Sequence, residues 1–269
     1  MANNKKYPIT KENEFARLNS AVMRMLKQAI DEELEILEEY ESTENWAEYE
    51  RLDGLDMDSL FYFFKRIERN FKRRTKDFGF REKLQDIANG INAQVERKFR
   101  QEWRNLLGID ITKDRFNGKS YKNLLNFWTN ENAHLIKTLP KETLGEMQKT
   151  VQEKFIAGAS PKALRGTLQE IYNVDKKRAE FWARDQVAKL NGQITQKQHQ
   201  DAGITKYKWQ ASMDSRTRAD HRALHNTIHQ WDNPPIVDTK SGRRNHPGGD
   251  YRCRCVAIPI FDPPAGRAG

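Results

Sequence analysis

Histidines and cysteines near the C-terminal end of the sequence have the residue types and spacings of a metal site. His221 and His225 are four residues apart, so on a helical turn they share one face. Cys253 and Cys255 are two residues apart, so on a strand both thiols point the same way. Imidazole and thiolate groups that converge in this way bind zinc tetrahedrally. We therefore expect one structural zinc ion held by His221, His246, Cys253 and Cys255, with His225 as the alternative histidine ligand.

Two other interpretations of this cluster stay open. Because two cysteines separated by a single residue are less diagnostic of zinc than a wider pair, they can instead be small buried hydrophobic residues. The cluster can also be the centre of a zinc- or thiol-dependent nuclease or hydrolase, since Arg252 and Arg254 would lower the pKa of a neighbouring thiol. However, the sequence has no glycine-rich phosphate loop, HExxH or paired-carboxylate motif. We therefore predict that the chain is not an enzyme and has no small-molecule substrate.

The composition points to a polar, basic protein rather than to a compact enzyme. Of 269 residues, 37% are hydrophobic and 32% are charged, and the formal net charge is +9. Low hydrophobicity favours an elongated helical body with much exposed surface. A basic excess favours contact with phosphate groups or with acidic protein surfaces.

The pattern of apolar residues predicts a mainly α fold. Helical periodicity recurs from Phe15 to Leu37, from Asp58 to Lys72 and from Leu84 to Leu106. We expect short helices around 124–128 and 142–155, followed by helices at 161–172 and 175–200, with Asp175 as the cap of the last. After Gly203 the pattern changes: residues 207–211 alternate as in a strand, residues rich in Pro, Gly, His and Asp follow, and 256–260 form a closing strand.

This pattern divides the chain into an elongated helical N-terminal and middle region and a small, loop-rich α+β C-terminal domain. The predicted domains are an N-terminal helical domain (1–108), a middle helical region (109–203), a C-terminal domain (204–262) and a disordered tail (263–269). The metal matters most for the C-terminal domain because that domain has few apolar residues. A structural zinc ion contributes on the order of 10 kcal/mol of folding free energy.

Charge is distributed unevenly over the N-terminal helices. Residues 31–58 hold thirteen acids and one base, whereas residues 65–83 hold nine bases and three acids. The first interpretation is that the two blocks pair across a helical hairpin; the alternative is that the basic face contacts double-stranded DNA. The residues of that DNA-binding alternative are Lys65, Arg66, Arg69, Lys72, Arg73 and Arg74.

The sequence also predicts where the protein is made. The cysteines are too close for an unstrained disulfide with each other, which favours a reducing compartment. The N-terminal segment has no apolar core typical of a signal peptide, and no run of apolar residues is long enough for a membrane segment. We expect synthesis in a cytoplasm.

The order of residues in the C-terminal part resembles one family. The motif residues, in order, are Trp209, Asp214, Arg216, Thr217, Arg218, His221, Leu224, Cys253, Arg254 and Cys255, with a proline-rich loop before the cysteines. This order, together with the preceding helix at 178–191, resembles the phage Mu F-like family of minor head, or head morphogenesis, proteins. The resemblance covers about residues 160–262. A glycine often follows the Leu224 region in the family, and here Asn226 stands there; asparagine also tolerates the left-handed conformation.

The resemblance implies a structural role in a tailed phage or prophage. Such proteins are minor capsid components of the virion, present in few copies inside the head and associated with the portal and the inner capsid. They aid head assembly and, in some cases, DNA packaging or ejection. The partners that the resemblance implies are therefore the portal protein and the major capsid protein, with double-stranded DNA as a third.

Overall fold

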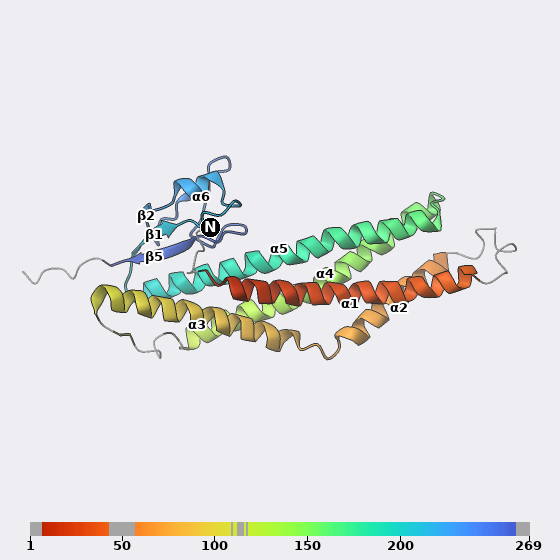
Figure 1. Ribbon diagram of the computed structural model, residues 1–269, viewed down its shortest axis with the longest axis horizontal. Coiled ribbons are helices and arrows are strands. Elements are labelled where there is room, and N and C mark those ends of the chain that lie inside the picture. Colours follow the sequence, from red (N-terminus) through yellow and green to blue (C-terminus); the bar gives the residue numbers. More distant parts are fainter. Residues whose placement is uncertain (1–6, 43–56, 109, 112–115, 117, 262–269) are drawn as a thin grey trace, which may run out of the picture. The chain divides into compact units, whose positions relative to one another are not determined.

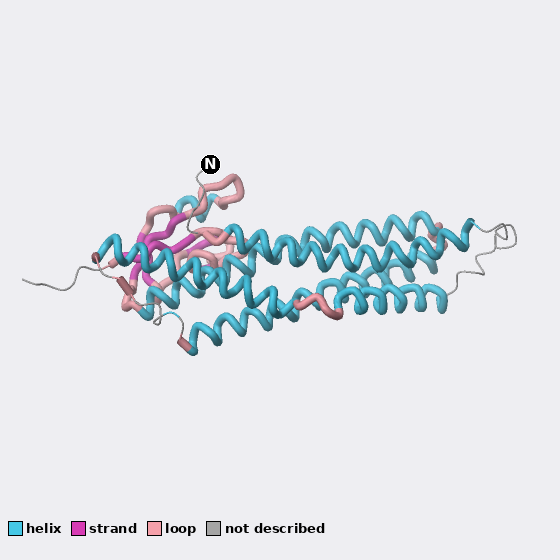
Figure 2. The backbone as a smooth tube through the Cα atoms, turned by 60° about the horizontal axis from the view of Figure 1, so that its bottom comes forward, coloured by secondary structure: helices cyan, strands magenta, loops and turns pink. Residues whose placement is uncertain are grey.

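The computed structural model describes residues 7–42, 57–108, 110–111, 116 and 118–261 (Figure 1). The predicted disordered tail, 263–269, lies outside the described residues. Helices dominate the first three quarters of the chain and a small β region follows, so the predicted mainly α fold with a small α+β C-terminal part is confirmed (Figure 2). None of the described helices is both long enough and apolar enough to cross a membrane.

The chain divides into two compact units, and each unit consists of segments that are separated in the sequence by segments of the other. Unit 1 comprises residues 1–15, 81–131 and 182–269, and unit 2 comprises residues 16–80 and 132–181. The long helices are α1 (Ile9–Ser42), α2 (Met57–Thr75), α3 (Phe80–Leu107), α4 (Lys119–Ile156) and α5 (Pro161–Asp201). Two of the predicted helix ends are confirmed by their glycines, since Gly108 and Gly203 follow α3 and α5 with φ of 69° and 78°.

Helix α4 is one continuous helix, and the prediction of two separate short helices there was wrong. Pro140 lies inside it and is buried. An internal proline costs about 3 kcal/mol because it removes a backbone hydrogen bond. Buried Ile136, Leu139 and Leu144 flank the proline, and burying each such side chain contributes about 1.5–3 kcal/mol. Packing therefore outweighs the local cost of the proline.

Helix α5 is also continuous where the sequence predicted a break at Asp175. The Asp175 side chain is buried and accepts a hydrogen bond from Thr143 Oγ1 at 2.7 Å. It therefore links α5 to α4 within unit 2 instead of capping a new helix. This role depends on a residue 32 positions away, which a local capping pattern does not reveal.

All the described strands belong to the C-terminal part of unit 1. Strands β1 (Lys206–Gln210), β2 (Ile228–Gln230) and β5 (Val256–Ile260) form an antiparallel sheet in the order β2-β1-β5. Strands β3 (Ile236–Asp238) and β4 (Arg243–Arg244) form a separate pair, and the short helix α6 spans Ala219–Ala223. The predicted alternation is confirmed, because Tyr207 and Trp209 of β1 are fully buried. The core around them consists of Tyr207, Trp209, Ala211, Trp231, Val237, Cys253, Cys255 and Ala257.

Candidate functional site

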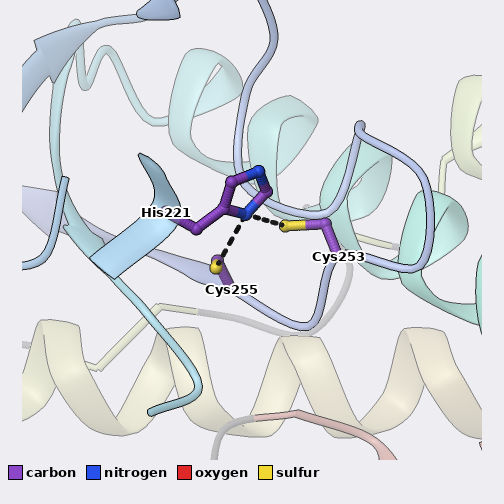
Figure 3. A group of neighbouring side chains, drawn as sticks. All are labelled: His221, Cys253 and Cys255. Atoms are coloured by element: carbon purple, nitrogen blue, oxygen red, sulfur yellow. Dashed lines mark hydrogen bonds between the residues drawn. The ribbon is translucent and has the colours of Figure 1, made fainter. Parts of the chain in front are cut away.

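Three of the predicted ligands converge at one buried point in this core (Figure 3). His221 comes from α6, and Cys253 and Cys255 come from the turn that leads into β5. His221 Nδ1 lies 3.4 Å from Cys253 Sγ and 3.6 Å from Cys255 Sγ. All three side chains are almost completely buried, with 2%, 3% and 2% of their surface exposed. The cysteines lie just before the strand rather than on it, but both thiols still face the same imidazole.

The other nitrogen of the His221 ring faces a carboxylate. His221 Nε2 is 3.2 Å from Asp250 Oδ2. Arg218 Nη2 is also 3.2 Å from Nε2, but its two hydrogens are used by Asp250 Oδ2 at 2.6 Å and the Tyr251 carbonyl at 3.0 Å. His221 Nε2 is therefore the donor to Asp250, and this leaves a lone pair on Nδ1 that points toward the two sulfurs.

Asp250 is held in place from several directions. Its side chain is buried and accepts hydrogen bonds from Arg218, and from Arg243 Nε at 2.9 Å. Its backbone carbonyl accepts the amide of Cys253 at 3.1 Å. A buried carboxylate is stable as an anion when charged partners and hydrogen bonds compensate its desolvation. The two arginines therefore fix the carboxylate that fixes the imidazole.

A backbone N–H group contacts one of the two sulfurs. The Gly248 amide donates to Cys253 Sγ at 3.4 Å. The pKa of Cys255 is lowered, first by the hydrogen bond from the Cys253 thiol and then by the N–H groups of Ser212 and Trp209, against the effect of burial. The same thiol–thiol hydrogen bond, together with burial, raises the pKa of Cys253 well above its usual value. Cys255 is thus the sulfur that most readily carries negative charge.

A close backbone contact with α5 positions the loop that carries Asp250. A Cβ on Gly192 would lie 2.7 Å from the Pro247 carbonyl oxygen, and one on Gly248 would lie 2.7 Å from the Ala188 carbonyl oxygen. Both glycines are therefore required for the loop to approach the helix. The amide of Arg252 adds a hydrogen bond to Asp185 Oδ1 of α5 at 2.9 Å.

The arginine between the two cysteines is tied to the start of α1. Arg254 Nε donates to Glu12 Oε2 at 3.0 Å, and Arg254 Nη2 pairs with the other carboxylate oxygen. Tyr7 Oη also donates to Glu12, at 2.7 Å. Arg254 Nη1 reaches Asp214 Oδ2 at 3.4 Å, so one guanidinium joins Glu12 to the segment that begins the motif. The pKa of Tyr7 is raised well above its usual value by burial and by the neighbouring Glu12 charge.

The remaining motif residues shape the segments just before and just after α6. Asp214 Oδ1 accepts the Arg216 amide at 3.0 Å and the Thr217 hydroxyl at 3.1 Å, which is the pattern of an aspartate-stabilised turn. Leu224 packs against the sulfur-containing core. Asn226 has φ of 66°, which confirms that asparagine takes the left-handed conformation at this position.

The other two histidines of the zinc prediction lie elsewhere. His246 Nδ1 is hydrogen-bonded to Tyr207 Oη at 2.9 Å, and its ring packs against Trp231 in a tilted arrangement. His225 Nδ1 accepts the Ala211 amide at 3.2 Å. Neither histidine belongs to the three-residue group with the cysteines. Burial lowers the pKa of His246, so a neutral imidazole is favoured there.

Comparison with known proteins matches the region around this centre. Residues 145–258 match the family of phage Mu protein F like proteins. This region is phage Mu F-like. The match confirms the resemblance over residues 145–258. Helix α5, the motif residues and the cysteine turn all lie within the Mu F-like region.

The curated proteins include one relative that matches a longer stretch. An uncharacterised protein of Haemophilus influenzae is 36% identical over 182 residues. The match covers 66% of this chain and 39% of the relative, so the chain spans about two fifths of the relative's length. No solved structure matches.

The basic residues proposed for DNA contact lie on α2, outside the Mu F-like region. Within unit 2, Arg66 Nε is 2.6 Å from Glu33 Oε2, and Arg73 and Arg74 pair with Glu32. Lys65 and Lys72 pair with Glu68 on their own helix, and Arg69 is exposed. The ion pairs between α1 and α2 are those that the hairpin interpretation of the charge blocks predicts. That interpretation concerned residues 31–58, of which 43–56 lie outside the described residues.

Sequence reasoning missed two carboxylates that contact the motif residues. They are Asp250, which contacts His221, and Glu12, which contacts Arg254. Asp250 had a local signal, since a histidine that uses one ring nitrogen for a ligand usually donates the other to a carboxylate. An acid three residues before Cys253 was a candidate for this role. Glu12 had none, because it is 242 residues away from Arg254 in the sequence.

Proposed function

We propose that this protein is a minor capsid protein of a tailed phage or prophage, bound at the portal and the inner capsid. In this role it aids head assembly and the packaging or ejection of DNA. The observation that carries the proposal is the phage Mu F-like match over residues 145–258. Within that region Arg254 pairs with Asp214 and with Glu12 of α1, and the cysteines on either side of it contact His221.

The burial of the reactive groups supports an assembly role rather than catalysis. A thiol or metal-dependent hydrolase must bring its reacting atoms into contact with substrate. Here the imidazole and both thiols are at most 3% exposed. Arg254, which the enzymatic alternative used to activate a thiol, is instead paired with Glu12 and Asp214. We therefore favour a structural centre over a nuclease or hydrolase.

The proposed role includes electrostatic contact with packaged DNA. The formal net charge of +9 supports electrostatic attraction to packaged DNA. The face on α2, however, already pairs Arg66, Arg73 and Arg74 with acids of α1. Any DNA contact on this face falls mainly to exposed groups such as Arg69.

Co-expression with the portal protein tests the proposal. The tagged full chain is purified from cells that also make the portal protein and the major capsid protein encoded beside it. We expect the portal protein to co-purify, and an unrelated tagged protein of similar charge serves as the control. Recovery of portal protein no greater than with that control would contradict portal association. Cleavage of added double-stranded DNA by the purified chain would favour the enzymatic alternative.

A further inference from the structure

We infer that His221 Nδ1, Cys253 Sγ and Cys255 Sγ bind one zinc ion, and that Asp250 is the positioning residue that orients the imidazole. This inference is independent of the proposed role in the head. It differs from the four-ligand site expected from the sequence, because His246 and His225 are used elsewhere. The ion would be structural and would join α6 to the turn before β5.

The distances between the three donor atoms fit a single ion. Zinc binds sulfur at about 2.3 Å and histidine nitrogen at about 2.0–2.1 Å, so tetrahedral geometry places the two donor atoms about 3.5 Å apart. The two observed nitrogen–sulfur distances, 3.4 Å and 3.6 Å, lie on either side of this value. The ligand atoms of all three residues lie within 4.8 Å of one another. The side chains thus already have the spacing that an ion would require.

Hydrogen bonding around the site leaves all three donor atoms directed at one another. His221 Nε2 is the proton donor to Asp250, so Nδ1 can act only as an acceptor or as a ligand. Gly248 donates its amide to Cys253 Sγ. Without an ion, one lone pair on Nδ1 accepts a hydrogen bond from only one thiol, and the thiols hydrogen-bond to each other. A metal ion satisfies the nitrogen and both sulfurs together, as thiolates.

Asp250 completes the arrangement expected around a metal-bound histidine. Ligand histidines usually donate their second ring N–H to a carboxylate, and the carboxylate is itself hydrogen-bonded. Asp250 receives that proton and is held by Arg218 and Arg243. This explains why an arginine three residues before His221 is part of the motif: it fixes the carboxylate that aligns the ring.

The site supplies three protein ligands. Among the described residues, no fourth histidine, cysteine or acidic residue joins the group. The fourth position therefore falls to a non-protein ligand such as water. Burial of His221, Cys253 and Cys255 distinguishes the site from a metal centre that is open to substrate.

Metal analysis of three proteins tests the inference. The full chain, Cys255→Ser and His246→Gln are produced with zinc in the medium and purified without a chelator. We expect about one zinc per chain in the wild type and in His246→Gln, and loss of the metal in Cys255→Ser. His246 is the matched control because it is a histidine of the same β region that lies outside the group. A wild-type chain free of zinc after refolding with equimolar zinc would overturn the inference, as would full zinc content in Cys255→Ser.

Two further measurements do not depend on the folding of Cys255→Ser. Cobalt added to the metal-free wild type should give the thiolate charge-transfer absorption of a tetrahedral site; absorption typical of oxygen ligands alone would refute the assignment. The Asp250→Asn variant should still bind one zinc, with an affinity 10–100-fold lower in competition with a chromogenic chelator. An unchanged affinity would contradict the positioning role of Asp250.

Discussion

The approach of the Asp250 loop to α5 predicts opposite effects for the same substitution at two positions of one helix. Gly192→Ala places a methyl group 2.7 Å from the Pro247 carbonyl oxygen and 3.4 Å from Gly248 Cα. Both contacts are with backbone, so no side-chain rotation relieves them. Gly166→Ala is the matched control, because nothing lies within 4 Å of its Cβ position. Both changes gain helix propensity of about 0.5–1 kcal/mol, and overpacking costs about 1–3 kcal/mol at Gly192 only.

Urea unfolding followed by circular dichroism measures the effect. We expect Gly166→Ala to raise the free energy of unfolding by about 0.5–1 kcal/mol. Gly192→Ala should lie about 1–3 kcal/mol below Gly166→Ala, because the difference between the two variants isolates the steric cost. Equal stabilisation by both substitutions would show that the loop does not approach α5 as described, and the positioning of Asp250 would have to be explained differently.

Three other results are expected. Glu12→Ala removes the buried carboxylate that pairs with Arg254 and should lower the free energy of unfolding by about 3 kcal/mol. Lys149→Ala, in an exposed pair, should change it by less than about 0.5 kcal/mol. Equally small losses in both variants would contradict the buried pairing. Burial lowers the pKa of His246 in the folded chain. Below about pH 6.5 the His246 imidazole therefore binds a proton more readily in the unfolded chain than in the folded chain. The free energy of unfolding should therefore fall as the pH falls below about 6.5, and His246→Gln should reduce this loss in urea unfolding; an identical pH dependence in both proteins would refute the assignment. If Arg69 contacts phosphate, Arg69→Glu should reduce the slope of log affinity for DNA against log salt by about one, and an unchanged slope would exclude that contact.

The helical part of the fold was largely predictable because it is governed by local periodicity. The stripes of apolar residues located α1, α2 and α3, and glycine marked the ends of α3 and α5. The errors came where tertiary contacts override local signals. Two short helices were predicted at 124–128 and 142–155, but buried neighbours of Pro140 sustain α4 as one helix. Asp175 was interpreted as a cap, but it binds Thr143 of α4.

The candidate site was predictable in its types of residue but not in its full membership. Spacing identified Cys253, Cys255 and His221, because each lies in a short motif. It could not show whether His246 or His225 joins them, since that depends on how the loops fold against the sheet. The structure uses His246 as the partner of Tyr207 instead. The contact between Glu12 and Arg254 joins residues that are 242 positions apart in the sequence, so no local pattern predicts it.

The central claim is that this protein is a minor component of a phage head. Quantitative mass spectrometry of heads purified from the phage or prophage that encodes it tests this claim most directly. We expect the chain to co-purify with heads in an amount comparable to the portal protein and far below the major capsid protein. The claim would be contradicted if heads contained none of the chain and formed in normal number, filled with DNA, when its gene was deleted.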